Sequence, residues 1–399
     1  KRGIASDIQE KKPFTSNKLD EYASSGTYYF KNAKIMFDSF DYIKKNRINV
    51  KGEQYVSLAY KYFFNQKKNE RIYIYTLKHF MQWGTPEDLE EYINWSNIFN
   101  KITKLKNQYT NNNGTLIVPM AGEGQRFVNE GYKKIKPLIE VSGKPMVIQA
   151  VNSLLNFKNK IFVIRSNMKG IKTISKKLKQ SYSNIYLKTL RNKTQGQADT
   201  ALNAIKQTDP NTNININENI TISACDNGVI FNSKKLNNYM NDTKKDIIVW
   251  GIRGHPHAIR NPEMYGWINL NKKSNKIISV SVKSPLQNTT LDPIIIGTFT
   301  FRNKFIARSS IETLIEKNNR INNEFYIDSS INEAIKLGFK CYYFEIDYYL
   351  SWGTPNDLKT FEYWQSCFHK WRHHNYNLYR DKNIPKDKIN ILEKKYNSF

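Results

Sequence analysis

An internal repeat constrains the fold of this chain more than any other feature of its sequence. Four short blocks near the N-terminus return in the same order near the C-terminus: residues 10–14 match 282–286, 25–32 match 296–303, 52–56 match 323–327, and 83–89 match 352–358. The spacings also agree, since Gly26 and Gly84 lie 58 residues apart and Gly297 and Gly353 lie 56 apart. Four matched blocks at matched spacing indicate two copies of one structural unit.

The repeat also predicts the domain boundaries. A long stretch of strand and helix patterns precedes Lys283, whereas its counterpart Lys11 follows only ten residues. We therefore expect residues 1–100 to be the C-terminal part of a truncated domain, 101–113 a linker, 114–370 one complete domain, and 371–399 a polar tail. The first residues, KRGI, include no initiator methionine and no signal-peptide pattern, so we interpret this start as a cut end.

The last repeated block predicts the start of a helix. In WGTPEDL (83–89) and WGTPNDL (352–358), the threonine is placed to cap the helix, proline suits the first turn, and the aspartate can complete a capping box. Apolar runs such as 341–346 are typical of strands. Strand and helix patterns that alternate along the chain predict an α/β layer fold.

Composition excludes several classes of protein. The chain has no run of 18 apolar residues, so we expect no membrane span, and its three separated cysteines suit a reducing cytoplasm. The net charge of +27 suggests a nucleic-acid partner. However, the lysines are spread along the chain and the aromatics fall within apolar patterns, so we expect no nucleic-acid ligand and keep salt-dependent binding to DNA or RNA as an alternative.

A glycine-rich turn follows a short apolar strand, TLIVPM (115–120), and reads AGEGQRF (121–127). Such a turn exposes successive backbone N–H groups that suit a triphosphate, and Arg126 adds a forked cation. The third glycine of a dinucleotide motif would fall at Phe127, and no GK[ST] follows. The turn is therefore neither a dinucleotide fingerprint nor a Walker A loop.

Two further motifs, KPL (136–138) and GKPM (143–146), follow at short distances. With them, residues 114–370 resemble the sugar-phosphate nucleotidyltransferase family, whose N-terminal motifs read GxGxRF, KPL and GKPM. The resemblance implies a Rossmann-like three-layer nucleotidyltransferase fold with a mixed, mostly parallel sheet. It also implies that Arg126 and Lys136 act on the phosphates. The residues implied to bind the nucleotide at this turn are Met120, Ala121, Gly122, Glu123 and Gly124.

Later positions also match the family. Gln195 and Gly196 match its loop-to-helix segment that contacts base and ribose, although a plain helix N-terminus would look the same. Asp226 ends an apolar strand and matches the family's Mg²⁺-binding aspartate, although a lone aspartate there could be a turn residue. On the acceptor side, Lys283 matches the lysine that holds the acceptor phosphate, although exposed lysines are usually only solvated. Tyr265 and Glu324 fall where the acceptor pocket is lined, although core packing also accounts for aromatic residues at such positions.

One position departs from the family pattern. Many relatives carry a second metal-binding aspartate in a WxDxGT motif, but the corresponding residues here are Ser351-Trp352 and, in the first copy, Gln82-Trp83. Asp347 is nearby, but its repeat counterpart is Lys78, so we assign it no role. Either one protein carboxylate holds the ion together with phosphates and waters, or activity is reduced.

The expected function is Mg²⁺-dependent transfer of a nucleotidyl group from an NTP to a phosphorylated small molecule, with a sugar 1-phosphate as the leading acceptor. An acceptor phosphate oxygen would attack the α-phosphorus and release pyrophosphate. Polysaccharide or capsule precursor synthesis would be the setting. Alternatives are a cytidylyltransferase for phosphocholine or a phosphorylated amino-acid derivative, and a non-catalytic nucleotide- or sugar-phosphate-binding module. The sequence indicates neither the base, nor the acceptor, nor the oligomeric state.

Overall fold

The computed structural model describes residues 3–16, 21–67, 69–105, 110–206, 218–271 and 273–397. By its internal contacts the chain forms two compact units, Lys1–Phe80 with Phe399, and Met81–Ser398. We call them the N-terminal unit and the main unit. Within the described residues, no helix is both long enough and apolar enough to cross a membrane.

A mixed sheet forms the centre of the main unit. Among the described residues its strands are β3 (Asn111–Pro119), β6 (Asn156–Arg165), β7 (Ile185–Leu190), β8 (Ile220–Ser223), β10 (Ile247–Ile252), β11 (Gly266–Leu270), β12 (Ile277–Val282), β13 (Ile294–Phe301) and β14 (Cys341–Glu345). The order along the sheet is β12-β11-β13-β8-β3-β6-β7, and β10 pairs with both β13 and β14. The strands β8, β3, β6 and β7 run parallel, as do β10 and β14, while β13 runs antiparallel to β8 and β10.

Helices cover both faces of this sheet. Side chains alternate along β3, so Ile117 packs with one helical layer, whereas Leu116 and Val118 pack with the other. The first layer contains α7 (Gln197–Lys206), α10 (Lys304–Glu316) and α11 (Ile327–Lys336). The second contains α5 (Met146–Asn152), α6 (Ile171–Ser181) and α8 (Ser233–Asn241). This arrangement confirms the predicted three-layer α/β fold with a mixed sheet.

Short elements complete the main unit around the sheet. They are α4 (Gln125–Asn129), η3 (Lys136–Leu138), β4 (Glu140–Val141), β5 (Lys144–Pro145), β9 (Asn227–Ile230), α9 (Pro256–Arg260), η4 (Pro262–Met264) and β15 (Tyr348–Ser351). The strands β9 and β15 form an antiparallel pair outside the central sheet, as do β4 and β5.

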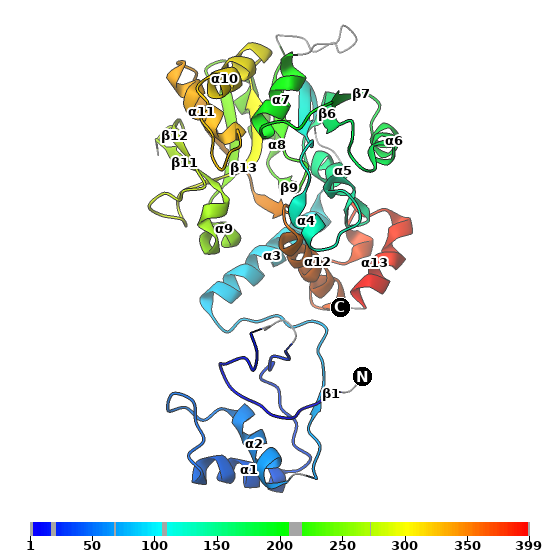
Figure 1. The fold of residues 1–399 in the computed structure, drawn as a ribbon, viewed down its shortest axis with the longest axis vertical. Coiled ribbons are helices and arrows are strands. Elements are labelled where there is room, and N and C mark those ends of the chain that lie inside the picture. Colours follow the sequence, from blue (N-terminus) through cyan, green and yellow to red (C-terminus); the bar gives the residue numbers. More distant parts are fainter. Residues whose placement is uncertain are drawn as a thin grey trace. The chain divides into compact units, whose positions relative to one another are not determined.

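A third hydrophobic cluster lies at one end of the main unit (Figure 1). Its helices are α3 (Pro86–Lys104), α12 (Pro355–Lys370) and α13 (Ile389–Tyr396), joined by the short η5 (Leu378–Arg380) and η6 (Lys386–Lys388). Both α3 and α12 begin with the predicted capping box, at Thr85 with Asp88 and at Thr354 with Asp357. The capping prediction is therefore confirmed at both sites.

The structure divides the chain differently from the sequence. The compact units separate after Phe80 rather than near residue 100, because α3 packs on α12 within the main unit. Of the expected linker, 106–109 lie outside the described residues, while β3 already begins at Asn111, which pairs with Asn156 of β6. The expected polar tail packs into the third cluster as far as residue 397, since Tyr376 and Tyr396 are buried; 398 and 399 lie outside the described residues.

The contact between α3 and α12 is reciprocal. Tyr92 and Phe361 each lie seven residues after the capping threonine of their helix, and Phe99 and Phe368 each lie fourteen residues after it. The rings of Tyr92 and Phe368 are 6.0 Å apart, and those of Phe99 and Phe361 are 5.6 Å apart. The seventh position of each helix thus contacts the fourteenth position of the other helix, as in a two-fold symmetric interface.

The N-terminal unit contains few regular elements. In its described residues they are β1 (Gly3–Ile4), α1 (Ala33–Lys45), η2 (Val56–Tyr60), α2 (Lys61–Gln66) and β2 (Tyr73–Ile74). Ile43, Leu58 and Ala59 form its small buried core. β1 pairs antiparallel with β2.

Candidate active site

The glycine-rich turn joins β3 to α4 as the sequence predicted. Met120 and Ala121 are buried, and the backbone N–H of Met120 donates to the carbonyl of Val163 at 3.0 Å, so these two residues anchor the turn to the sheet. Gly122 and Glu123 are exposed. Gly124 precedes α4 with φ of +64°, and a Cβ there would lie 2.9 Å from the Cβ of Lys136. Glycine therefore allows the turn to pack on the lysine stem.

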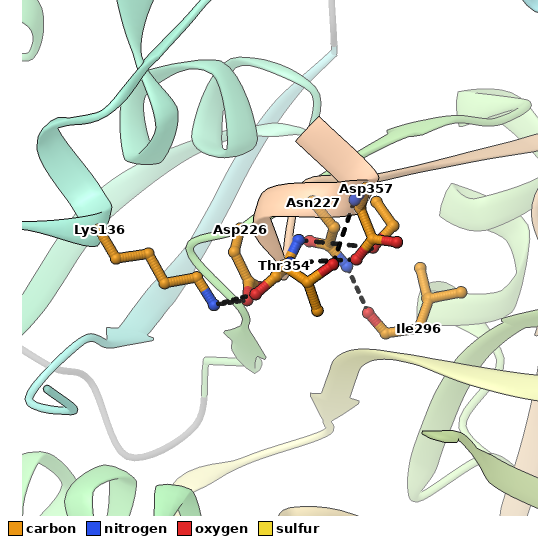
Figure 2. A network of polar contacts seen from close by, with 8 residues as sticks. Lys136, Asp226, Asn227, Ile296, Thr354 and Asp357 are labelled. Carbon is orange, nitrogen blue, oxygen red and sulfur yellow. Dashed lines mark hydrogen bonds and ion pairs between the residues drawn. The ribbon is translucent and has the colours of Figure 1, made fainter. Parts of the chain in front are cut away.

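Lys136 and Asp226 form an ion pair at the mouth of this turn (Figure 2). The Lys136 Nζ donates to Asp226 Oδ2 at 2.5 Å and to the carbonyl of Gly353 at 2.9 Å. The lysine enters from η3, and the aspartate lies between β8 and β9. The resemblance assigned Lys136 to the phosphates and Asp226 to the metal ion. In the structure these two residues contact one another directly.

Burial and charge act in opposite directions on Lys136. Burial, the largest single effect, lowers the pKa of its ammonium, but the charge and hydrogen bond of Asp226 together with Cys225 raise that pKa above its ordinary value. The lysine is therefore held as a cation in a partly desolvated position. A fixed cation beside the glycine turn is suited to a polyanion.

The turn that carries Gly353 is fixed from both sides. On one side, the backbone N–H of Trp352 donates to the carbonyl of Asp226 at 2.9 Å, and Ser351 pairs with Asn227 between β15 and β9. On the other side, the Asp357 carboxylate accepts hydrogen bonds from the Ser351 hydroxyl at 3.2 Å and from the backbone N–H of Thr354, which caps α12. Figure 2 shows Thr354 and Asp357 beside the ion pair.

The carboxylate set around Asp226 is small. No group of three or more histidine, cysteine, aspartate or glutamate side chains suited to a metal ion occurs among the described residues. Ser351 stands where the family pattern has its second aspartate, and its hydroxyl is directed to Asp357. Asp226 alone fits the way Mg²⁺ is often held, by one protein carboxylate together with substrate phosphates and waters.

A second group of charged residues surrounds Tyr326. The Lys283 Nζ lies 5.7 Å from the centre of the Tyr326 ring, and the Tyr326 hydroxyl is hydrogen-bonded to the Glu324 side chain. Burial and the Glu324 charge raise the pKa of Tyr326 to about 12, which Arg126 lowers in part. Arg126 also acts electrostatically on Lys136. The structure therefore brings Lys283 and Glu324 to the same tyrosine, and the charge of Arg126 acts on it electrostatically.

Tyr265 lies beside this group but points its hydroxyl elsewhere. Its carbonyl accepts from the backbone N–H of Lys283 at 2.9 Å, while its hydroxyl is 2.7 Å from His257 Nδ1. The other ring nitrogen of His257 is 3.8 Å from Asp357. His255 packs edge-on against Tyr265 and Tyr349, and burial lowers the pKa of His255 to about 3, so this imidazole is neutral.

The segment expected to contact base and ribose, Gln195 and Gly196, is hydrogen-bonded to other parts of the chain. The carbonyl of Gln195 accepts from the backbone N–H of Phe325 at 2.8 Å, and its side-chain oxygen accepts from Arg320. A Cβ at Gly196 would lie 2.6 Å from the backbone of Phe325. Glycine at position 196 thus allows the backbone to approach Phe325 closely, and this contact ties the start of α7 to the residues before α11.

Sequence reasoning missed several residues of this site. His257 and Arg320 belong to no motif, and the partner of Arg320, Gln195, lies 125 residues away in the sequence. Tyr326 lies inside a repeated block but was not singled out as a contact of Lys283. Its repetition as Tyr55 in the first copy was the signal that could have identified it.

Comparisons with known proteins show the fold of this chain. No family model matches the sequence, and no curated protein matches it. Among solved structures, the nucleoside-diphosphate-sugar pyrophosphorylase from Vibrio cholerae RC9 is 20% identical, with a TM-score of 0.52, over 62% of this chain and 98% of its own. The inositol-1-phosphate CTP transferase from T. maritima is 14% identical, with a TM-score of 0.48, over 65% of this chain and 96% of its own.

The likeness to the Vibrio cholerae structure shows the fold. This chain contains the Rossmann-like α/β fold of that pyrophosphorylase, as the motifs in residues 114–146 predicted. The roles of the individual site residues stay predictions.

Proposed function

We propose that the main unit is a nucleotidyltransferase that joins an NTP to a phosphorylated small molecule and releases pyrophosphate. The observation that carries this proposal is the Lys136–Asp226 ion pair at the mouth of the glycine-rich turn. It places a held cation and a carboxylate beside exposed main chain at residues 122–123, at an edge of the sheet where ligands bind in open α/β folds. The named activity of the Vibrio cholerae protein of the same fold agrees with this reaction.

The nucleotide would lie along the glycine turn. Main-chain N–H groups of residues 122–124 and the Arg126 guanidinium would hold the β- and γ-phosphates. Lys136 would exchange its contact with Asp226 for the α-phosphate, where charge increases during transfer. The backbone near Gln195 would border the base and ribose.

Asp226 would hold Mg²⁺ together with phosphate oxygens and waters. The ion would supply neutralisation of the triphosphate and of the leaving pyrophosphate. The Asp226 backbone is fixed by Trp352, and the next side chain, Asn227, donates to the carbonyl of Ile296 at 2.5 Å. The carboxylate is therefore held in place by its neighbours.

The acceptor would bind on the side of Tyr326. Lys283 would contact the acceptor phosphate, and Glu324 and Tyr265 would border the rest of the molecule. A phosphate oxygen of the acceptor then attacks the α-phosphorus, the bond from the α-phosphorus to the bridging oxygen breaks, and pyrophosphate leaves. A phosphate monoester is already ionised at neutral pH, so no protein base is required.

The acceptor class is a sugar 1-phosphate in the first instance, with phosphocholine or a phosphorylated amino-acid derivative as the alternative. The setting would be the cytoplasm, where NTPs are supplied, and the pathway would make polysaccharide or capsule precursors. A non-catalytic binding module is the second candidate, and the serine at position 351 favours it because a family carboxylate is lost there. Neither candidate calls for a nucleic-acid partner.

Residues 1–100 would be the C-terminal part of a second copy of this domain. The support is that matched positions in the two parts share unusual backbone conformations. The matched φ angles are 56° and 57° at Lys11 and Lys283, 75° and 75° at Gly26 and Gly297, and 51° and 53° at Arg47 and Asn318. Matched bridges also join Val50 to Glu53 and Ile321 to Glu324.

A matrix of the four common NTPs against sugar 1-phosphates, phosphocholine and phosphorylated amino-acid derivatives tests the function. Each reaction is read by pyrophosphate release and by the mass of the product. One NTP and one acceptor class should give turnover that stops when EDTA removes divalent ions. Binding of an NTP without any pyrophosphate release across the matrix would instead establish the non-catalytic module.

A further inference from the structure

Three side chains of the N-terminal unit form an exposed cluster. The Lys11 Nζ lies 4.7 Å from the centre of the Tyr55 ring and 3.7 Å from a carboxylate oxygen of Glu53. The Tyr55 hydroxyl donates to the same carboxylate. The side chains of Lys11 and Glu53 are 53% and 68% exposed, so a ligand can reach both charged groups.

The same three residue types meet in the main unit. There Lys283 lies over Tyr326, and Tyr326 is hydrogen-bonded to Glu324, in the group that we place at the acceptor phosphate. The residues correspond pairwise through the repeated blocks, and in both groups the lysine lies over the tyrosine ring and the tyrosine hydroxyl is bonded to the glutamate. The cluster in the N-terminal unit therefore reproduces a local arrangement and not only a sequence.

The backbone conformation of the lysine is also the same in both units, although the neighbouring structure differs. Lysine rarely adopts a positive φ, yet φ is 56° at Lys11 and 57° at Lys283. In the main unit, the Lys283 backbone is bonded to Tyr265, next to β11. The described part of the N-terminal unit holds no strand equivalent to β11. The conformation at Lys11 thus occurs without that neighbouring strand.

A contribution to folding stability does not explain this arrangement. An ion pair between exposed side chains contributes little to folding, because water and salt screen both charges. A left-handed lysine, by contrast, costs stability, and such strained residues concentrate at ligand-binding sites. The hydrogen bond to Tyr55, with the nearby Glu53, raises the pKa of Lys11, so its side chain is a cation at neutral pH.

We propose that Lys11, Tyr55 and Glu53 form a second binding site for a phosphorylated small molecule. Lys11 contacts the phosphate, and Glu53 accepts hydrogen bonds from hydroxyl groups on the rest of the ligand. The ligand class is a phosphate monoester that carries hydroxyl groups, such as a sugar phosphate. This inference rests on the proposed function, because the ligand class is taken from the acceptor assigned to Lys283.

Lysine labelling tests both sites in the same molecule. The full chain is treated with an amine-reactive reagent in glucose 1-phosphate, in inorganic phosphate, or in sodium chloride of equal ionic strength, and the rate at each lysine is read by mass spectrometry. At a ligand concentration about ten times Kd, mass action should slow labelling of Lys11 about tenfold. The neighbouring Lys12, which is exposed, is the internal control and should be unaffected.

A matched variant separates the roles of the two charges. Glu53 also pairs with Lys11, so protection is expressed relative to each protein's own labelling rate in sodium chloride. On that scale, Glu53→Gln should weaken the protection of Lys11 by glucose 1-phosphate but not the protection by inorganic phosphate, which brings no sugar hydroxyl groups. Equal protection of the variant and the wild type by both probes would remove Glu53 from the site. Circular dichroism of the variant checks that the N-terminal unit is folded.

The outcomes separate this inference from the proposed function. If Lys283 is protected and Lys11 labels at the same rate as Lys12, the second site is refuted while the acceptor site stands. Protection of Lys11 without protection of Lys283 supports the second site and contradicts the acceptor role of Lys283. If neither lysine is protected, both assignments fail.

Discussion

Phe99 and Phe368 occupy matching positions on α3 and α12, and their ring centres lie 5.5 Å apart. Both side chains are buried, and Phe99 also packs edge-on against Tyr376 at 4.6 Å. One residue of α3 therefore joins α12 to the C-terminal segment. This relationship makes α3 a part of the main unit, although its repeat places it with the N-terminal residues.

Phe99→Ala should lower the free energy of unfolding of the main unit by about 3–5 kcal/mol, because truncation of a buried phenylalanine leaves a cavity. Denaturant unfolding followed by tryptophan fluorescence measures the loss. Ile93→Ala on the same helix is the matched control, since Ile93 is 46% exposed, and it should cost less than about 1 kcal/mol. Equal losses for the two variants would show that α3 is not packed as described.

Asp226→Asn and Lys136→Met should each reduce pyrophosphate release at least about 100-fold, since each removes a charge placed for the triphosphate. The fold should persist, as judged by circular dichroism. Lys134→Met is the control, because Lys134 pairs with Glu140 on the surface at 2.9 Å. Turnover by Asp226→Asn at the wild-type rate in Mg²⁺ would refute the metal assignment.

Ser351→Asp should make thermal stability depend on Mg²⁺. The new carboxylate would lie close to Asp357, whose oxygen is 3.2 Å from the present hydroxyl, and like charges at this distance repel. We expect a lower Tm than wild type in EDTA and recovery in Mg²⁺. Ser351→Asn provides similar size without charge and should show no recovery. A Tm of Ser351→Asp that is independent of Mg²⁺ would contradict the idea that this position can complete a metal site.

Asp328→Asn should stabilise the protein at neutral pH. Burial raises the pKa of Asp328 from 3.8 to about 6, although Lys283 opposes this. The folded state therefore holds this proton more tightly than the unfolded state, and stability falls as pH rises from about 4 through 6. The expected cost above pH 7 is on the order of 3 kcal/mol.

The measurement for Asp328 is the difference in Tm between variant and wild type at several pH values. This difference should be smallest at about pH 4, about half of its full value near pH 5, and largest at pH 8. Asp387→Asn, at an exposed position, is the control for removing a carboxylate from the surface. A constant difference for Asp328→Asn would show that its carboxyl does not titrate near pH 6.

Local patterns predicted the features that depend on neighbouring residues. Both capping boxes, the strand before the glycine turn and an α/β layer fold were predicted, because caps and hydrophobic periodicity are encoded within a few residues. The three-layer arrangement with a mixed sheet was predicted from the family resemblance. The Lys136–Asp226 contact was not predicted. Its partners are 90 residues apart, and the carbonyl of Gly353 lies 217 residues beyond Lys136, so only the folded chain brings them together.

Two expectations about irregular segments failed for physical reasons. The asparagines at 111–113 suggested a loop, but Asn111 is bonded to Asn156 by its side chain at 2.8 Å and begins β3. Residues after 370 suggested a polar tail, but Tyr376 donates to Asp381 at 2.9 Å and both are buried. In both segments, polar side chains find partners within the chain, at the surface for Asn111 and in the buried interior for Tyr376 and Asp381.

The reciprocal contact of α3 with α12 affects which amino-acid substitutions this interface can accept. When two identical chains pair, every substitution is present twice, so a change that suits one side is also imposed on the other. Here both helices belong to one polypeptide, and their pairing does not depend on protein concentration. Tyr92 can therefore stand opposite Phe368 while Phe361, at the matching place, remains a phenylalanine. Substitutions can therefore accumulate in one helix of the interface without being imposed on the other.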